Sequence, residues 1–147
     1  MKISFYFAVL FISFAKKMVR PKAISFLPAF LLLIISFVLL ILPGSDIPKS
    51  DIFELLHFDK WVHIGMFGLL TILWCYPLLK AGIATKIIFF LIAAAVTLYG
   101  VAMEFVQEFF AVGRSFDSMD ILADTIGAVL AFYWMILQLK KYKSGSI

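Results

Sequence analysis

Long apolar stretches separated by short polar segments dominate the hydrophobic pattern of the chain. A helix needs about 20 mainly apolar residues to cross the hydrocarbon core of a bilayer. Four windows satisfy this requirement, at residues 23–42, 62–79, 87–106 and 121–139. Helices are the expected form because lipid offers no hydrogen-bond partner to the backbone. The pattern therefore predicts an all-α, polytopic membrane bundle of four transmembrane helices.

The composition supports a membrane protein and excludes other classes. Of the 147 residues, 64% are hydrophobic and only 15% are charged, and the mean hydropathy is +1.07. A soluble domain has about half apolar and about a quarter charged residues. So few polar side chains do not cover a water-facing surface, which excludes a soluble enzyme or nucleic-acid binder. The single cysteine, Cys75, excludes an internal disulfide and a cysteine-rich metal site.

The basic residues indicate which way the helices point. Lysine and arginine concentrate in cytoplasmic loops near the ends of transmembrane helices. Nine of them lie in segments that share one side of the predicted bundle: Lys16, Lys17, Arg20, Lys22, Lys80, Lys86, Lys140, Lys141 and Lys143. All nine acidic residues lie in or beside the opposite face. Both termini are therefore expected in the cytoplasm, with the loops at 43–61 and 107–120 outside, and the net charge of +4 does not indicate a nucleic-acid partner.

The first residues of the chain allow several interpretations. Residues 3–15 form an apolar run that is short for a transmembrane helix and resembles the core of a signal peptide. The basic cluster after this run argues against export of the junction. The alternatives to a signal peptide are an interfacial segment, or an upstream extension with Met18 as the functional start. We expect an N-terminal segment at 1–22, a membrane domain at 23–139 and a basic cytoplasmic tail at 140–147.

Ionisable residues inside the predicted helices are the first candidates for a functional site, because each is costly in a membrane. His63, Glu104 and Asp124 lie at similar depth near the same end of three helices. A shallower polar layer surrounds them, made of Asp59, Gln107, Glu108, Arg114, Asp117 and Asp120. Buried polar residues often only hold helices together through hydrogen bonds. The convergence of a histidine, several acids and an arginine at one face favours a functional site.

Small residues predict that the carboxylates face other helices, since small residues allow close helix approach. They lie on the Glu104 face of the third window and beside Asp124 in the fourth: Ala93, Thr97, Gly100, Ala123, Gly127 and Ala131. In the second window, Gly65 and Gly68 are not on the face of His63. The first window contains no ionisable residue and is expected to serve as scaffold.

Four short motifs carry the polar residues of the candidate site. They are Asp59-Lys60-Trp61-Val62-His63, Glu104-Phe105-Val106-Gln107, Gly113-Arg114-Ser115-Phe116-Asp117-Ser118-Met119-Asp120 and Asp124-Thr125-Ile126-Gly127. Over residues 59–131 the chain resembles the VanZ-like family, whose pattern is D-K-x-x-H, E-x-x-Q, R-x-x-D-x-x-D and N-x-x-G. Asp124 departs from this pattern, because the family usually has asparagine there. The resemblance implies a bacterial plasma-membrane protein, in a family named for a member linked to resistance to the glycopeptide teicoplanin, and it implies no particular reaction.

The chemistry of these residues divides them into two groups. The candidate catalytic residues are those able to transfer protons: His63, Glu104, Asp120 and Asp124. The candidate substrate-binding residues are Asp59, Lys60, Gln107, Arg114 and Asp117. Among them, the two cations are suited to a phosphate or carboxylate group.

Two functions are consistent with this set of residues. One is a binding protein that holds the anionic headgroup of an envelope lipid or lipid-linked precursor. The alternative is a membrane-embedded enzyme that uses His63 and carboxylates for acid–base or metal-assisted transfer or hydrolysis of a phosphate or acyl group at the outer leaflet.

The cofactor and the partners are less constrained by the sequence. Histidine and carboxylates are suitable ligands for a divalent metal, but the chain contains no diagnostic metal motif. A transporter is disfavoured because no ionisable residue continues a path toward the opposite face. The expected partners are membrane lipids or lipid-linked envelope precursors and no nucleic acid, while the sequence leaves the oligomeric state open.

Overall fold

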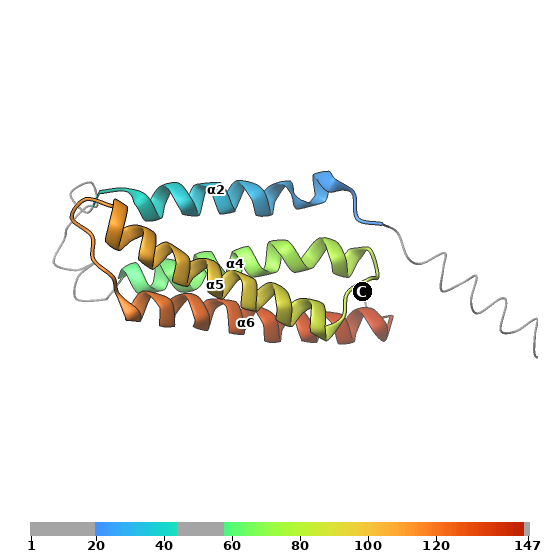
Figure 1. The fold of residues 1–147 in the computed structure, drawn as a ribbon. Coiled ribbons are helices and arrows are strands. Elements are labelled where there is room, and N and C mark those ends of the chain that lie inside the picture. The colour runs from blue at the N-terminus through green and yellow to red at the C-terminus, as the bar shows by residue number, and fades with distance from the viewer. Residues whose placement is uncertain (1–19, 44–57, 146–147) are drawn as a thin grey trace, which may run out of the picture.

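The computed structural model describes residues 20–43 and 58–145 of the chain. In these ranges the chain forms a short 3-10 helix and four α-helices that lie along one another as an elongated bundle (Figure 1). The elements are η1 (Ala23–Phe26), α2 (Leu27–Ile41), α4 (Phe58–Lys80), α5 (Lys86–Phe110) and α6 (Ser118–Lys143). The predicted all-helical fold is confirmed. The alternatives for residues 1–17, including a start at Met18, lie outside the described residues.

Each predicted window corresponds to one helical segment that is long and apolar enough to span a membrane. The spans are Ala23–Ile41, Phe58–Lys80, Lys86–Phe110 and Ser118–Lys143, with mean hydropathies of 2.9, 1.7, 2.1 and 1.6. The last three extend beyond their windows because charged and polar residues continue the helices at both ends. These helices support a multi-pass membrane protein, and they carry the candidate residues as rigid elements.

Local chemistry sets several helix ends. Pro28 lies in the first turn of α2, where a missing backbone N–H costs nothing. The Thr85 side chain caps α5 by accepting a hydrogen bond from the Ile88 amide at 3.1 Å. Asp117 caps α6 in the same way, accepting from the Met119 amide at 2.8 Å. Gly82, at φ 71°, supplies the left-handed residue of the tight turn between α4 and α5.

Helices α4 and α6 approach each other closely at a pair of glycines. A Cβ atom added to Gly68 would lie 3.2 Å from the Gly127 carbonyl oxygen. A Cβ atom on Gly127 would collide with the Ile64 carbonyl oxygen on α4. The predicted close approach at Gly127 is therefore confirmed, and Gly68 contributes to it although it is not on the His63 face. Gly65 has open space around it.

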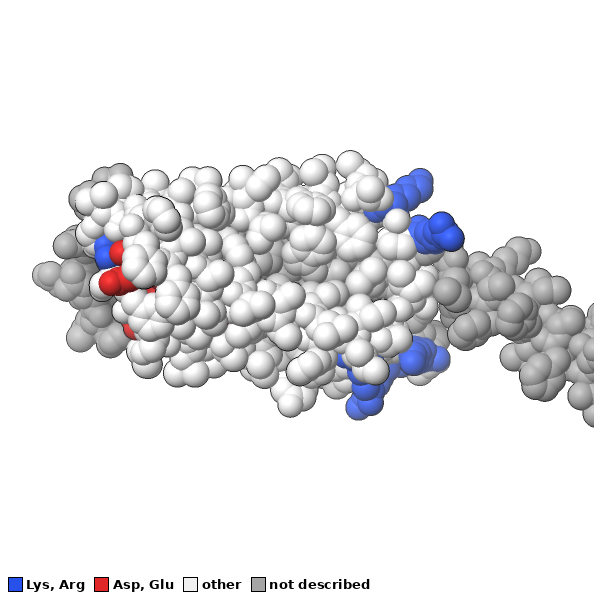
Figure 2. Space-filling view, viewed as in Figure 1, with Lys and Arg blue, Asp and Glu red and all other residues white. Residues whose placement is uncertain are grey.

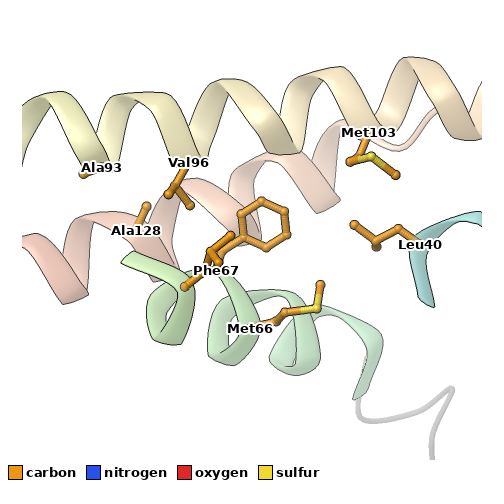
Figure 3. Packing of buried hydrophobic residues seen from close by; sticks show 8 residues of the cluster. Leu40, Met66, Phe67, Ala93, Val96, Met103 and Ala128 are labelled. Atoms are coloured by element: carbon orange, nitrogen blue, oxygen red, sulfur yellow. The ribbon is translucent and has the colours of Figure 1, made fainter. Parts of the chain in front are cut away.

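The apolar core draws one or more side chains from every long helix (Figure 3). Its buried members are Leu40, Met66, Phe67, Leu70, Ala93, Val96, Met103 and Ala128. The Phe67 ring lies among them and is fully buried. Large hydrophobic side chains also cover the outside of the bundle, as is required of a surface that meets lipid.

Basic and acidic side chains are concentrated at opposite ends of the bundle (Figure 2). Lysine and arginine gather at the end where α2 begins and α6 finishes, and the carboxylates gather at the other. We call these the basic end and the acidic end. The segregation expected from the sequence is present, and the assignment of both termini to the cytoplasm stays a prediction.

Candidate functional site

The sequence-predicted site residues lie at the acidic end, on three helices and one loop. Asp59, Lys60 and His63 come from the first turns of α4, and Glu104 and Gln107 from the last turns of α5. The loop before α6 and the start of that helix supply Arg114, Asp117, Asp120 and Asp124. The antiparallel arrangement of neighbouring helices places these chain segments at the same end (Figure 1).

Lys60 is surrounded by carboxylates from two parts of the chain. Its Nζ atom lies 2.5 Å from Asp117 Oδ2, 2.5 Å from Asp120 Oδ1 and 3.1 Å from Asp59 Oδ2. Only 18% of the Lys60 side chain is exposed, so these carboxylates replace much of the water around the ammonium. Lys60 therefore joins α4 to the start of α6 as an internal counter-ion, and its charge is already balanced.

His63 lies between two aspartates of α6. Its Nδ1 atom is 2.8 Å from Asp124 Oδ1, and its Nε2 atom is 3.8 Å from Asp120 Oδ1. Both His63 and Asp124 are buried, with 5% and 1% of their surfaces exposed. The imidazole ring is parallel to that of Phe67, with 6.2 Å between the ring centroids. The ring is thus held in place by a hydrogen bond on one nitrogen and by packing along its face.

Gly100 of α5 makes room for this pair of residues. A Cβ atom at position 100 would clash with the Asp124 carboxylate and would lie 2.9 Å from Phe67 Cε1. Because Gly100 has no side chain, the Asp124 carboxylate can lie against the backbone of α5. The predicted small-residue face of α5 therefore contributes directly to the geometry of the site.

The two glutamates of α5 hold the loop that precedes α6. Glu104 Oε2 accepts a hydrogen bond from the Asp117 amide at 2.8 Å, and Glu108 Oε2 accepts one from the Phe116 amide at 2.7 Å. Glu104 is almost completely buried, with 1% of its surface exposed. These bonds fix the backbone on either side of position 117, so that the Asp117 side chain points to Lys60.

Asp117 lies outside the membrane-spanning segments and has a perturbed acidity. The hydrogen bond from the Lys60 ammonium favours the ionised carboxylate and lowers the pKa of Asp117 below its ordinary value of 3.8. The hydrogen bond from the Met119 amide acts in the same direction. Asp117 is therefore an anionic member of the site at neutral pH.

Helix α2, expected to be scaffold, is joined to the site by two polar contacts. Gln107 Nε2 donates a hydrogen bond to the Leu40 carbonyl oxygen at 2.8 Å. This carbonyl belongs to the last turn of α2, where no intrahelical partner exists. Farther along, the Ser36 and Tyr99 hydroxyls are 3.0 Å apart. Gln107 thus has a structural partner in α2, in addition to its predicted place beside the site.

Arg114 differs from the other cations at this end. Its side chain is partly buried, and its Nε atom is buried without a hydrogen-bond partner. In the described part of the chain, Arg114 forms no ion pair with a carboxylate, whereas Lys60 forms three. The two cations expected to bind an anion therefore have different surroundings, and Arg114 is the one without a carboxylate partner among the described residues.

Two aromatic residues that pack beside the site, Phe67 and Tyr99, were not identified from the sequence. Phe67 lies one turn after His63 on the same helix, so its position on the histidine face could have been found from spacing. Tyr99 stacks on Phe67, with ring centroids 5.7 Å apart, and also contacts Ser36 of α2. No spacing rule relates residues so distant in the chain, so this contact required the structure.

The described residues contain no group of three or more histidine, cysteine, aspartate or glutamate side chains arranged to hold a metal ion. Where three carboxylates do converge, the Lys60 ammonium lies between them. These carboxylates therefore have a counter-ion supplied by the protein itself.

The four charged motifs thus meet at one end of a bundle of membrane-spanning helices. A family model described as VanZ/LLP1 matches residues 3–139 of the chain. The chain belongs to the VanZ/LLP1 family. Comparison with curated proteins and with solved structures gave no match.

In this VanZ/LLP1 protein the motifs contact one another in pairs. The D-K-x-x-H motif binds both aspartates of the R-x-x-D-x-x-D motif through Lys60, and its His63 binds the motif that begins at Asp124. The E-x-x-Q motif binds the loop through Glu104 and α2 through Gln107. An asparagine at position 124 could accept the same hydrogen bond, but it would not carry the negative charge that Asp124 supplies.

Proposed function

We propose that the acidic end binds the anionic headgroup of a membrane lipid or lipid-linked envelope precursor, with Arg114 as the residue that holds the phosphate. On the expected topology, this site faces the outer leaflet of the bacterial plasma membrane. The guanidinium group is suited to the role because its planar donors match two phosphate oxygens at once.

The observation that carries the proposal is the distribution of partners among the charged groups. Every described carboxylate at this end has a hydrogen bond or an ion pair: Asp59, Glu104, Glu108, Asp117, Asp120 and Asp124. Lys60 and His63 are the partners of the four aspartates, and backbone amides donate to the two glutamates. Arg114 is the one described cation at this end that has no carboxylate partner. A partly buried guanidinium without a counter-ion favours an external anion.

The surroundings of Arg114 support a lipid as the source of that anion. The side chains just before it, Phe109, Phe110 and Val112, are 73%, 80% and 78% exposed. Such apolar exposure beside a charged loop is suited to the boundary between headgroups and acyl chains. A phospholipid or a lipid-linked precursor offers both an anion for Arg114 and chains for these side chains.

Native mass spectrometry of the protein released from lipid nanodiscs tests this proposal. Wild-type protein in nanodiscs that contain phosphatidylglycerol should retain a bound phospholipid, and Arg114→Gln should lose it while the protein still inserts. Arg114→Lys should recover part of the binding, because charge is restored without the bidentate geometry. Arg20→Gln, which removes a cation from the basic end, is the matched control. Equal lipid retention by Arg114→Gln and Arg20→Gln would reject the proposal.

The proposed lipid binding would also give the protein a role in glycopeptide resistance. A protein that holds an envelope lipid at the outer leaflet can change how a glycopeptide reaches its lipid-linked target. Cells that produce the wild-type protein should then survive a teicoplanin concentration that inhibits cells producing Arg114→Gln at the same level. Equal teicoplanin susceptibility of the two kinds of cells would show that lipid binding by Arg114 does not confer resistance.

The His63–Asp124 pair favours a second candidate function, an enzyme that transfers a proton to or from a bound headgroup. Asp124 fixes one imidazole nitrogen at 2.8 Å, and the other has no hydrogen bond within the described residues. That arrangement suits a general base or acid. Purified protein incubated with phosphatidylglycerol or a lipid-linked precursor would release a new product, and His63→Asn would not. Bound lipid without turnover would reject the enzyme and retain the binding protein.

A further inference from the structure

The carboxylates around Lys60 outnumber its single positive charge. Asp59, Asp117 and Asp120 all lie within ion-pair distance of the Lys60 Nζ atom. One ammonium offsets one carboxylate, so this cluster keeps an excess of negative charge. The side chains of Asp59 and Asp117 are 61% and 42% exposed, whereas that of Asp120 is 9% exposed. The two carboxylates that are open to an external partner are therefore Asp59 and Asp117.

The acidic end as a whole is also negative. Among the described residues it contains six carboxylates, with Lys60 and Arg114 as the lysine and arginine. A protonated His63 would not reverse the sign. Charges a few ångströms apart interact strongly where water is partly excluded, and salt screens them little there. A headgroup that carries only negative charge would therefore approach Arg114 against the field of these carboxylates.

Arg114 lies close in the chain to one of the exposed carboxylates. It precedes Asp117 by three residues, which span at most about 11 Å between Cα atoms. The loop that holds both is tied to α5, because Glu104 accepts a hydrogen bond from the Asp117 amide. Glu108 accepts another from the Phe116 amide. A guanidinium with a buried, unpartnered Nε atom is thus held near an exposed carboxylate, which suits a ligand with charges of both signs.

We propose that the phosphate held by Arg114 belongs to an amine-bearing phospholipid, whose primary ammonium group binds Asp59 and Asp117. The inference rests on the proposed function, because it assigns a ligand class to the same site. Phosphatidylethanolamine has this chemistry, with a phosphate and an ammonium joined by a short linker. Its ammonium donates charge-assisted hydrogen bonds and supplies positive charge that Lys60 alone does not. Phosphatidylglycerol has the phosphate without the ammonium and should bind more weakly.

Native mass spectrometry of the protein released from nanodiscs that contain equal amounts of phosphatidylethanolamine and phosphatidylglycerol tests the ligand class. The wild-type protein should retain phosphatidylethanolamine over phosphatidylglycerol by about threefold, because ion pairs with exposed carboxylates are individually weak. Asp59→Asn and Asp117→Asn should each reduce this preference. Free phosphoethanolamine at the same concentration should displace little of the lipid, because it has no acyl chains.

Glu108→Gln is the matched control for the two aspartate variants. It removes the same charge from an exposed residue at the same end of the bundle. Among the described carboxylates, Glu108 is not one that Lys60 contacts, so this variant should keep the preference. The amide side chains introduced at positions 108 and 117 can still accept the hydrogen bonds from the backbone amides.

Several results would overturn the ammonium assignment and leave the phosphate site of Arg114 intact. The first is equal retention of the two lipids, or a preference for phosphatidylglycerol, with both lipids lost in Arg114→Gln. The second is a preference that both aspartate variants keep, or that Glu108→Gln reduces as much as they do. Complete displacement by phosphoethanolamine would assign the site to a soluble ligand. Lipid retention that does not depend on Arg114 would instead reject the proposed function, and this inference with it.

Discussion

The glycine contact between α4 and α6 gives a quantitative prediction for the variant Gly127→Ala. The new methyl group would meet the Ile64 carbonyl oxygen and the Gly68 amide nitrogen, both of them backbone atoms that cannot rotate away. Inserting one methyl group into a packed interface costs about 1–3 kcal/mol. The helices would have to separate near His63 and Asp124, so the variant should lose stability and disturb the site.

Gly65→Ala is the matched control, since a Cβ atom there has nothing within 4 Å. Replacing a helical glycine by alanine without a clash stabilises a helix by about 0.5–1 kcal/mol. The free energies of unfolding of the two variants should therefore differ by about 1.5–4 kcal/mol. Gly68→Ala should lie between them, because its closest contact would be 3.2 Å.

Reversible unfolding in mixed micelles with increasing sodium dodecyl sulfate, followed by tryptophan fluorescence, measures these differences. The expected order of stability is Gly65→Ala, then Gly68→Ala, then Gly127→Ala. A Gly127→Ala variant as stable as Gly65→Ala would refute the close approach of α4 and α6, and with it the geometry that brings His63 to Asp124.

Three further predictions concern the polar contacts. Lys60→Met leaves aspartates without their counter-ion and should lower the free energy of unfolding by about 2–5 kcal/mol in the same assay, and Lys60→Arg should recover part of this loss. A Lys60→Met variant as stable as the wild type would contradict the ion pairs. Because Lys60 lowers the pKa of Asp117, the ion pair between them stabilises the protein fully above pH 3.8, and this stabilisation is lost as the pH falls through the lowered pKa. The free energy of unfolding of Asp117→Asn should therefore fall less on acidification than that of the wild type. Parallel curves of unfolding free energy against pH for the two proteins would refute this prediction. Gln107→Leu leaves the Leu40 carbonyl unpaired and should lower the free energy of unfolding by about 1–3 kcal/mol. The control is the same substitution at Gln138, near the other end of the bundle in α6, and an equal loss in the two variants would argue against the Gln107–Leu40 contact.

The fold could be predicted from the sequence because the membrane restricts the alternatives. An apolar stretch of sufficient length becomes a helix in lipid whatever its other propensities. The helix ends were less predictable, because Asp59 and Lys60 reduce the local hydropathy and yet continue α4. Their charges are satisfied by partners that no hydropathy window includes.

The candidate site was predictable as a set of residues and not as a set of contacts. Spacing predicted His63, Glu104 and Asp124 at one depth; in the structure His63 contacts Asp124, and Glu104 binds the Asp117 amide just before α6. Spacing cannot tell which carboxylate is nearest to which cation, because this depends on the rotation of each helix about its axis. Lys60 and Arg114 are therefore equivalent in the sequence, and only the structure shows that Lys60 is paired with carboxylates while Arg114 pairs with none in the ranges 20–43 and 58–145.

A structure of the protein determined in nanodiscs that contain phosphatidylglycerol would test the central claim most directly. The measurement is the distance between the Arg114 guanidinium and the nearest lipid phosphate. We predict a phosphate within hydrogen-bond distance of Arg114, with Lys60 still bound to Asp117 and Asp120. An Arg114 guanidinium paired with a carboxylate of the protein, and no phosphate beside it, would contradict the claim.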